Sequence, residues 1–137
     1  MAISIKKITE HIGAEIDCDV RLRELSESDF IDVKKAFDEH SVLVFRGHPL
    51  SDEDQISFSE RFGSLETTVN SNPEGGGTVM TVLSNVDQQN KVIPPEDKRM
   101  VFNTGNQMWH TDSSFKRVPA LMSLLSGREV PSIGGET

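Results

Sequence analysis

The chain has 137 residues, of which 35% are hydrophobic and 26% are charged, and its formal net charge is −8 at pH 7. This length and apolar content fit one small domain with a modest core. The acidic balance argues against nonspecific binding to nucleic acid or to anionic membranes, since both need clusters of Lys and Arg.

The N-terminus and the cysteine content indicate a cytosolic protein. Residues 1–7 lack the order of charge, apolar run and small-residue cleavage site that defines a secretory signal. No apolar run approaches the roughly 20 residues of a membrane-spanning helix. The single Cys18 excludes an internal disulfide and a thiolate metal cluster. We expect Cys18 to be a buried or half-buried strand residue without a nucleophilic role.

Two short strands and a helix are predicted at the start of the chain. Apolar and polar residues alternate over residues 3–8 and 12–18, with Gly13 near the turn between them. Ser26 can cap a helix, and Asp29 stands three residues on, as in a capping box. The apolar face of this helix consists of Phe30, Val33, Ala36 and Phe37.

A further strand and a second helix follow. The continuous apolar run at residues 41–47 predicts a strand that is buried on both faces. Ser51 and Asp54 repeat the capping pattern, and the helix is expected to run to about Phe62, with Gly63 after its end. The residues expected on one side of this helix are Ile56, Ser59 and Phe62.

The rest of the chain reads as loops and short strands. Residues 67–78 and 84–97 are two loops, each long enough to cover a pocket. Residues 78–83 and 120–126 read as strands, and the second of them as buried. Several short strands after two early helices indicate an α+β or mainly β domain.

Residues 106–115 contain the combination of side chains that is most typical of a metal-binding or catalytic site. His110 and Asp112 stand two residues apart, and in a strand such residues point to the same face. One carboxylate and two imidazoles form the facial triad of non-haem Fe(II) oxygenases, with open positions for a co-substrate and dioxygen. Taken alone, the tripeptide favours a solvated pair at the end of a surface strand. It also suits Zn(II) in a hydrolase or Mn(II) in a cupin-like protein.

Several motifs in order through nearly the whole chain resemble one known family. They are Arg61-Phe62-Gly63, residues 83–87, the Trp-His-Thr-Asp-Ser-Ser-Phe run at 109–115, Pro119, Val130-Pro131 and the Gly-Gly-Glu-Thr run at 134–137. Together they resemble the Fe(II)- and 2-oxoglutarate-dependent oxygenases related to taurine dioxygenase and 2,4-dichlorophenoxyacetate dioxygenase. The amino-acid sequence of residues 106–115 resembles most the family members that degrade aryloxyalkanoates.

The resemblance implies roles for particular residues. His110 and Asp112 would be two of the iron ligands, and the hydroxyl of Thr137 would contact 2-oxoglutarate. Asn106 matches a substrate-contacting position, and Ser113 is a further candidate for the substrate pocket. No catalytic residue beyond the metal ligands is implied.

The resemblance also implies the fold. The family has a double-stranded β-helix, a cupin-like jelly roll with flanking helices, and residues 1–137 would be the N-terminal portion of a single oxygenase domain. The second iron-binding histidine and the arginine that pairs with 2-oxoglutarate would lie after residue 137. For these 137 residues alone we therefore expect no charge-transfer absorption with Fe(II) and 2-oxoglutarate. Trp109 is expected to pack in the core beside the site.

The expected function is hydroxylation of a small organic acid, aryloxyalkanoate-like or sulfonate-like. Fe(II) would be the cofactor, 2-oxoglutarate and O2 the co-substrates, and succinate and CO2 the co-products. The expected partners are a small anionic substrate and further copies of the chain, without nucleic acid or membrane. The alternative is a truncated, inactive fragment that acts only as a binding or association module through unpaired strand edges.

Overall fold

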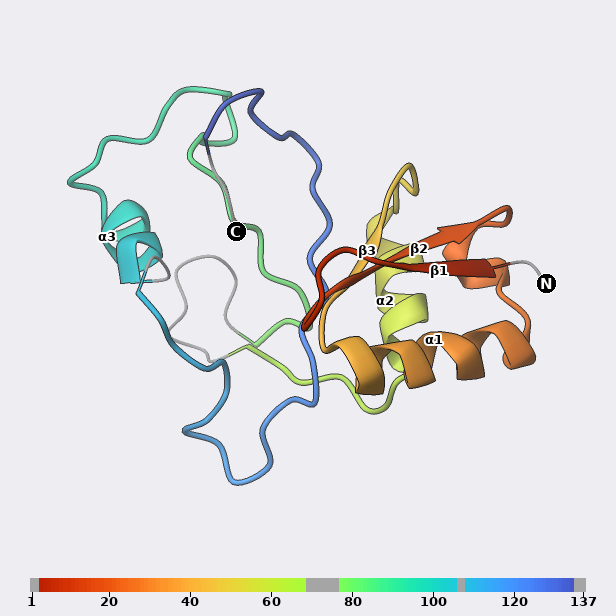
Figure 1. Cartoon of the computed structure of the whole chain (residues 1–137). Coiled ribbons are helices and arrows are strands. Elements are labelled where there is room, and N and C mark those ends of the chain that lie inside the picture. The colour runs from red at the N-terminus through yellow and green to blue at the C-terminus, as the bar shows by residue number, and fades with distance from the viewer. Residues whose placement is uncertain (1–2, 69–76, 106–107, 135–137) are drawn as a thin grey trace. The chain divides into compact units, whose positions relative to one another are not determined.

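The computed structural model divides the chain into two compact units (Figure 1). The structure describes residues 3–68, 77–105 and 108–134, except for the side chains of residues 102 and 103. Residues 1–63 and 124–137 form the first unit, here called the sheet unit. Residues 64–123 form the second, here called the loop unit.

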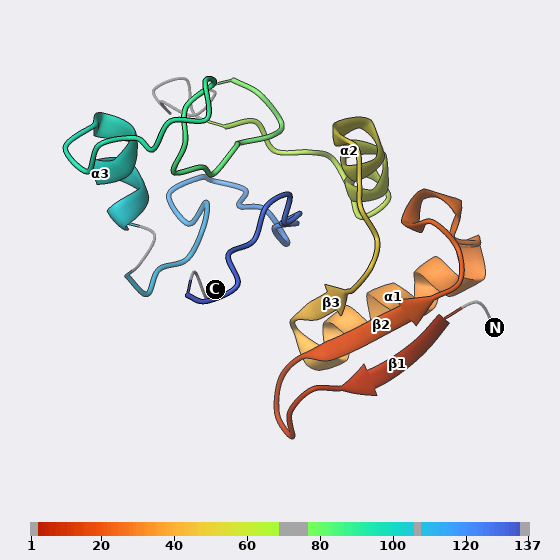
Figure 2. The same ribbon diagram turned by 90° about the horizontal axis from the view of Figure 1, so that it is seen from above.

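The sheet unit is built on three strands in the order β1-β2-β3. β1 (Ile3–Lys7) pairs antiparallel with β2 (Ala14–Cys18), which pairs in parallel with β3 (Leu43–Phe45). A parallel pair needs a long crossover connection. Here the 3-10 helix η1 (Leu22–Glu24) and α1 (Glu27–His40) supply it, and Figure 2 shows α1 running along one face of the sheet.

The two helices of the sheet unit begin where the sequence predicts. The amide of Asp29 donates to Ser26 Oγ at the start of α1, and the amide of Asp54 donates to Ser51 Oγ at the start of α2 (Asp52–Glu60), each at 3.1 Å. These bonds satisfy amides that have no partner inside the helix. α1 ends at Ser41, whose left-handed φ of 62° closes the helix in the way that glycine usually does.

Removing the cap of α2 tests this reading of the helix start. The Ser51→Ala variant is expected to lower the free energy of unfolding by about 1 kcal/mol, because the amide of Asp54 loses its side-chain acceptor. Urea denaturation followed by circular dichroism measures the change. Lys34→Ala on the exposed face of α1 is the control, with an expected change within about 0.5 kcal/mol. Equal effects of the two substitutions would contradict the capping role.

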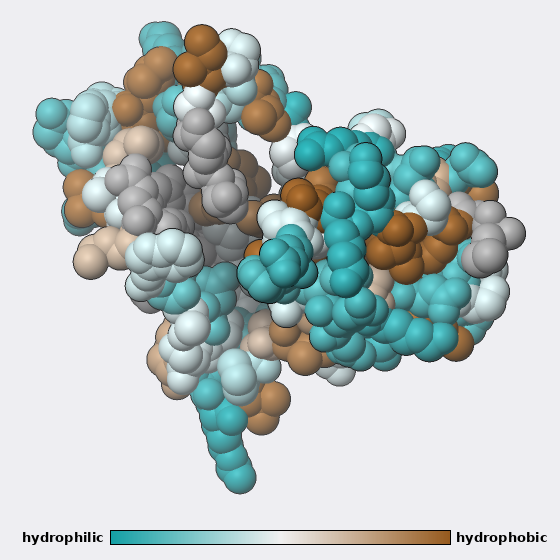
Figure 3. Space-filling view, in the orientation of Figure 1, coloured by the Kyte–Doolittle hydropathy of each residue, from teal (hydrophilic) through white to brown (hydrophobic). Residues whose placement is uncertain are grey.

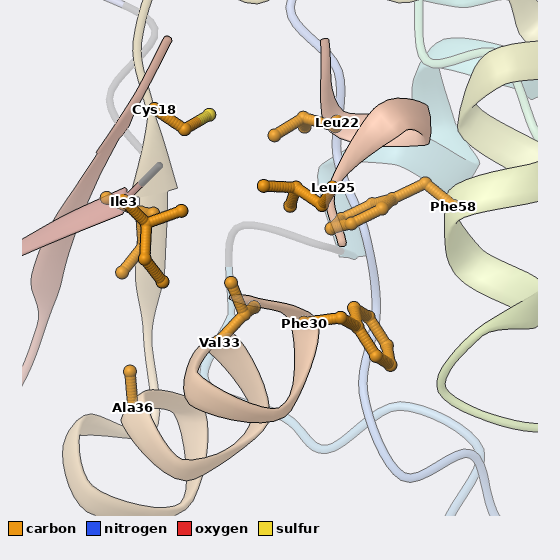
Figure 4. Packing of buried hydrophobic residues seen from close by; sticks show 9 residues of the cluster. Ile3, Cys18, Leu22, Leu25, Phe30, Val33, Ala36 and Phe58 are labelled. Atoms are coloured by element: carbon orange, nitrogen blue, oxygen red, sulfur yellow. The ribbon is translucent and has the colours of Figure 1, made fainter. Parts of the chain in front are cut away.

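The core of the sheet unit lies between the sheet and its helices (Figure 4). Its largest fully buried side chains are Phe58, Ile16 and Val33. Cys18 is buried, as predicted, and burial raises the pKa of its thiol, whose sulfur lies 3.3 Å from Nε2 of His48. Phe58 makes edge-to-face contacts, at centroid distances of 6.0, 5.9 and 5.4 Å, with Phe30, Phe45 and Phe62.

Arg61 joins the beginning of α1 to the end of α2. Its guanidinium donates to the carbonyl of Leu25 at 2.9 Å and to Glu27 Oε2 at 3.1 Å. The same group stacks on the ring of Phe30, 4.0 Å from the centroid. The Arg-Phe-Gly run recognised in the sequence thus has a structural role at the helix junction.

Three strand predictions are corrected by the structure. Of residues 41–47, only Leu43–Phe45 form a strand, and it is half-buried, so the prediction of burial on both faces is wrong. Residues 78–83 and 120–126 form no strand, and Val82 and Leu125 are 65% and 72% exposed. An apolar run becomes a strand only when a neighbour pairs with its backbone. Among the described residues the sheet contains only β1, β2 and β3, and the backbone bond between Thr68 and Thr78 belongs to a loop.

The loop unit is held together by turns and one helix. Its helix, α3 (Lys98–Gly105), was not predicted. Asp97 precedes it and accepts from the amide and side chain of Arg99, which lowers the pKa of Asp97 to about 2. Ile93 is the one buried hydrophobic residue among the described part of this unit. Figure 3 shows hydrophobic residues at its surface.

The architecture agrees with the α+β prediction, because a small sheet is covered by helices. A double-stranded β-helix is not formed by the residues that the structure describes. The helices within these residues are all too short or too polar to cross a membrane.

Candidate metal centre

His110 and Asp112 lie side by side in the loop unit. Nε2 of His110 is 3.1 Å from Oδ1 of Asp112, and the two side chains are 45% and 62% exposed. The two residues do not lie in a strand, the case in which the sequence would place them on one face, because Asp112 opens a turn. Their proximity is nevertheless as expected, because the turn brings the carboxylate back towards the ring.

The separation of these two atoms fits a shared metal ion. An octahedral ion with ligands at about 2.1 Å places adjacent ligand atoms about 3.0 Å apart. The 3.1 Å between Nε2 and Oδ1 is close to the separation of two adjacent ligand atoms. The exposure of both groups leaves room for further ligands.

The remaining polar atoms of the pair are also engaged. Nδ1 of His110 lies 2.7 Å from the carbonyl oxygen of Met108, and Nε2 faces Oδ1 of Asp112. Both oxygens only accept, so both ring nitrogens donate, and a metal ion at this place would replace the proton on Nε2. Oδ2 of Asp112 accepts from the hydroxyl of Ser123 at 3.2 Å. Outer partners of this kind orient metal ligands and tune their basicity.

These contacts also shift the protonation of the ring. The hydrogen bond to Met108 and the neighbouring carboxylate of Asp112 raise the pKa of His110. The negative charge beside the ring favours the imidazolium, and it favours a metal cation at the same place.

Glu66 contacts the turn that begins at Asp112, although the sequence gives no sign of this contact. Its Oε1 accepts from Ser113 Oγ and from Lys116 Nζ, each at 2.7 Å. Lys116 also donates to the carbonyl of Thr67 at 2.8 Å. Hydrogen bonds from Lys116 and Ser113 lower the pKa of Glu66, so the residue is an anion that holds both groups. Glu66 and Ser113 are 47 residues apart, a separation at which no local pattern links them.

The structure describes only some of the other residues for which the sequence predicted a role at the site. Asn106 and Thr137 lie outside the described residues, and their roles stay predictions. Ser113 is described, but its hydroxyl is engaged by Glu66, and its place in the substrate pocket also stays a prediction. Trp109 is fully exposed, so its predicted core packing is wrong within the described residues, where no apolar layer covers residues 108–112.

The described residues would supply only part of a metal site. No group of three or more His, Cys, Asp or Glu side chains among them is placed to hold one ion. His11, His40 and His48 belong to the sheet unit. A complete facial triad therefore needs a ligand from beyond the described part of the chain.

Comparison with known proteins gives a consistent picture. Residues 4–137 match the family model for taurine catabolism dioxygenase TauD, TfdA family. The alpha-ketoglutarate-dependent 2,4-dichlorophenoxyacetate dioxygenase of Cupriavidus pinatubonensis is 41% identical over 124 residues, covering 87% of this chain and 43% of that protein. The (S)-phenoxypropionate/alpha-ketoglutarate-dioxygenase of Sphingobium herbicidovorans is 33% identical over 138 residues, covering 99% and 44%.

A solved structure shows the same likeness. The crystal structure of AAD-2 in complex with Mn(II) and N-oxalylglycine superposes with a TM-score of 0.69 at 30% identity, covering 88% of this chain and 40% of that one. The chain thus spans roughly two fifths of the length of these relatives. The family match over almost all of its residues shows that the chain belongs to the TauD/TfdA family of dioxygenases.

Proposed function

We propose that the protein is an Fe(II)- and 2-oxoglutarate-dependent dioxygenase that hydroxylates a small organic acid. The observation that carries the proposal is the pairing of His110 Nε2 with Asp112 Oδ1 at the spacing of adjacent metal ligands. Imidazole and carboxylate suit Fe(II), whereas a thiolate would favour softer metals. The whole domain would be a double-stranded β-helix, with the second histidine and the 2-oxoglutarate-binding arginine supplied from beyond the described residues.

The residues of the turn would each have a part in holding the metal. His110 and Asp112 would bind it through Nε2 and Oδ1. Met108 would keep the imidazole in the tautomer that leaves Nε2 unprotonated, and Ser123 would hold Oδ2 so that Oδ1 faces the ring. Iron, when bound, would supply the reaction of O2 with 2-oxoglutarate and a substrate C–H bond, in which one oxygen atom enters succinate, the other enters the hydroxylated product, and CO2 is released.

The proposed substrate class is the aryloxyalkanoates. Both relatives named above act on phenoxy acids by their printed names, and both are matched across more than four fifths of this chain. A sulfonate is the second choice, because it rests on the family model alone. Thr137 would contact 2-oxoglutarate, and Asn106 and Ser113 would lie near the substrate.

The test is anaerobic addition of Fe(II) and 2-oxoglutarate to the protein as its gene encodes it. We expect the charge-transfer absorption of the iron chelate, followed by succinate release that requires both O2 and phenoxyacetate. Taurine replaces phenoxyacetate as the control substrate, and we expect it to support little succinate release. Product formation with Zn(II) and without O2 would instead favour hydrolysis. Absence of both absorption and turnover would favour an association module.

A further inference from the structure

We propose that Glu66 is a positioning residue for the metal-binding turn. Through its contacts with Ser113 and Lys116 it would fix the direction in which Asp112 presents its carboxylate. This inference rests on the proposed function, because the metal site at His110 and Asp112 is part of that proposal. It concerns a residue outside the His-x-Asp motif, in a segment that sequence analysis left without a role.

The contacts of Glu66 span the turn from both ends. Ser113 follows Asp112 directly, and Lys116 stands at the far side of the turn, where its amide donates to the carbonyl of Ser113 at 2.9 Å. Oε1 of Glu66 accepts from both side chains at 2.7 Å. One carboxylate oxygen therefore ties the two ends of the turn to the same point.

The backbone at Ser113 needs such support. Its φ of 58° lies in the left-handed region, which residues other than Gly, Asn and Asp adopt rarely. This conformation turns the chain just after Asp112. Without the bond from Ser113 to Glu66, the residue is expected to relax towards an ordinary φ, and that rotation would carry the carboxylate of Asp112 away from His110.

The ion pair of Glu66 and Lys116 is partly shielded from water. The side chains are 29% and 25% exposed, which makes the pair less screened than the Lys7–Glu39 pair of the sheet unit, whose side chains are 60% and 66% exposed. Lys116 is held on its other side by the carbonyl of Thr67. Lys116 is thus held by two acceptors, which fixes the position of the Glu66 carboxylate. A positioning group must be fixed in this way if it is to hold a metal ligand within a fraction of an ångström.

The first experiment measures Mn(II) affinity by electron paramagnetic resonance, independently of turnover. Glu66→Ala is expected to bind Mn(II) about 10- to 100-fold more weakly, the range found when outer partners of metal ligands are removed. Glu66→Gln keeps a carbonyl oxygen at the position of Oε1 and is expected to recover much of the affinity. Asp97→Ala is the matched control, since Asp97 has similar exposure at 31%, pairs with Arg99 and belongs to the same unit. Its Mn(II) affinity should equal that of the wild type.

A double-mutant cycle separates positioning from general destabilisation. If Glu66 acts through Ser113, then Ser113→Ala weakens Mn(II) binding by itself, and the double variant loses less than the product of the two single losses. Ser113→Ala removes one hydrogen bond and so tests the contact even where Glu66→Ala does not fold. Independent, multiplying losses would overturn the proposal.

The outcomes distinguish this inference from the proposed function. Wild-type affinity in both Glu66→Ala and Ser113→Ala, with metal bound normally, would refute the positioning role and leave the oxygenase proposal intact. No Mn(II) binding by the wild-type protein would overturn both. Loss of affinity in Asp97→Ala as large as in Glu66→Ala would refute the specific role of Glu66.

Discussion

Asp112→Ala is expected to weaken Fe(II) binding by more than about 100-fold, beyond the usual effect of losing an outer partner of a metal ligand. The substitution removes the carboxylate that lies 3.1 Å from His110 Nε2, so that among the described residues only the imidazole remains of the two proposed ligands. It also removes the negative charge that favours a cation at this place. The charge-transfer absorption with 2-oxoglutarate should disappear at stoichiometric iron.

Two variants serve as controls for Asp112→Ala. Asp32→Ala removes an exposed carboxylate from α1 in the sheet unit, and it should leave the absorption unchanged. Asp112→Asn keeps an oxygen at the position of Oδ1 without the charge, so its Fe(II) affinity should lie between the wild type and Asp112→Ala. Full absorption in Asp112→Ala at wild-type iron concentrations would show that the carboxylate is not a ligand.

Phe58→Ala is expected to reduce the free energy of unfolding by about 3–5 kcal/mol. Phe58 is 1% exposed, and its ring contacts aromatic residues on α1 and β3 as well as Phe62. Truncation leaves a cavity where two helices and the sheet meet. Since small domains have a total stability of about 5–15 kcal/mol, a loss of this size removes a large share of it.

Urea denaturation measures this change, and a second apolar position provides the comparison. Ile31→Ala, on α1 and 46% exposed, should cost less than about 1 kcal/mol because it leaves no cavity. Phe58→Leu keeps most of the apolar volume and should fall between the two. A loss in Phe58→Ala no larger than that in Ile31→Ala would contradict the placement of Phe58 at the centre of the core.

The parts of the fold that local chemistry decides were predictable from the sequence. Ser26 and Ser51 mark the helix starts because a cap depends on residues only three positions apart. Phe58 was missed because α2 is short and has little amphipathic pattern, so its buried side is set by what the helix packs against. The strands expected at residues 78–83 and 120–126 failed for a related reason, since strand pairing depends on distant partners.

The candidate site was predictable only in part. The closeness of His110 and Asp112 follows from their spacing, although a turn and not a strand produces it. The family resemblance, confirmed by the match over residues 4–137, rests on motifs whose order local physics does not explain. Glu66 and Ser123 were missed because their contacts with the turn depend on how the loop unit folds back on itself.

The order of strands in the sheet has a consequence for handling the protein. β1 lies at one edge of the sheet, and within the described residues nothing pairs with its outer side. Lys6 and Lys7 stand exposed on this edge, and although Lys7 pairs with Glu39 at 3.6 Å, the charge of Lys6 opposes stacking of one molecule's edge on another's. The Debye length shrinks from about 10 Å at 0.1 M salt to about 3 Å at 1 M. Concentrated salt therefore weakens this protection, and colloidal stability should be greatest in dilute buffers.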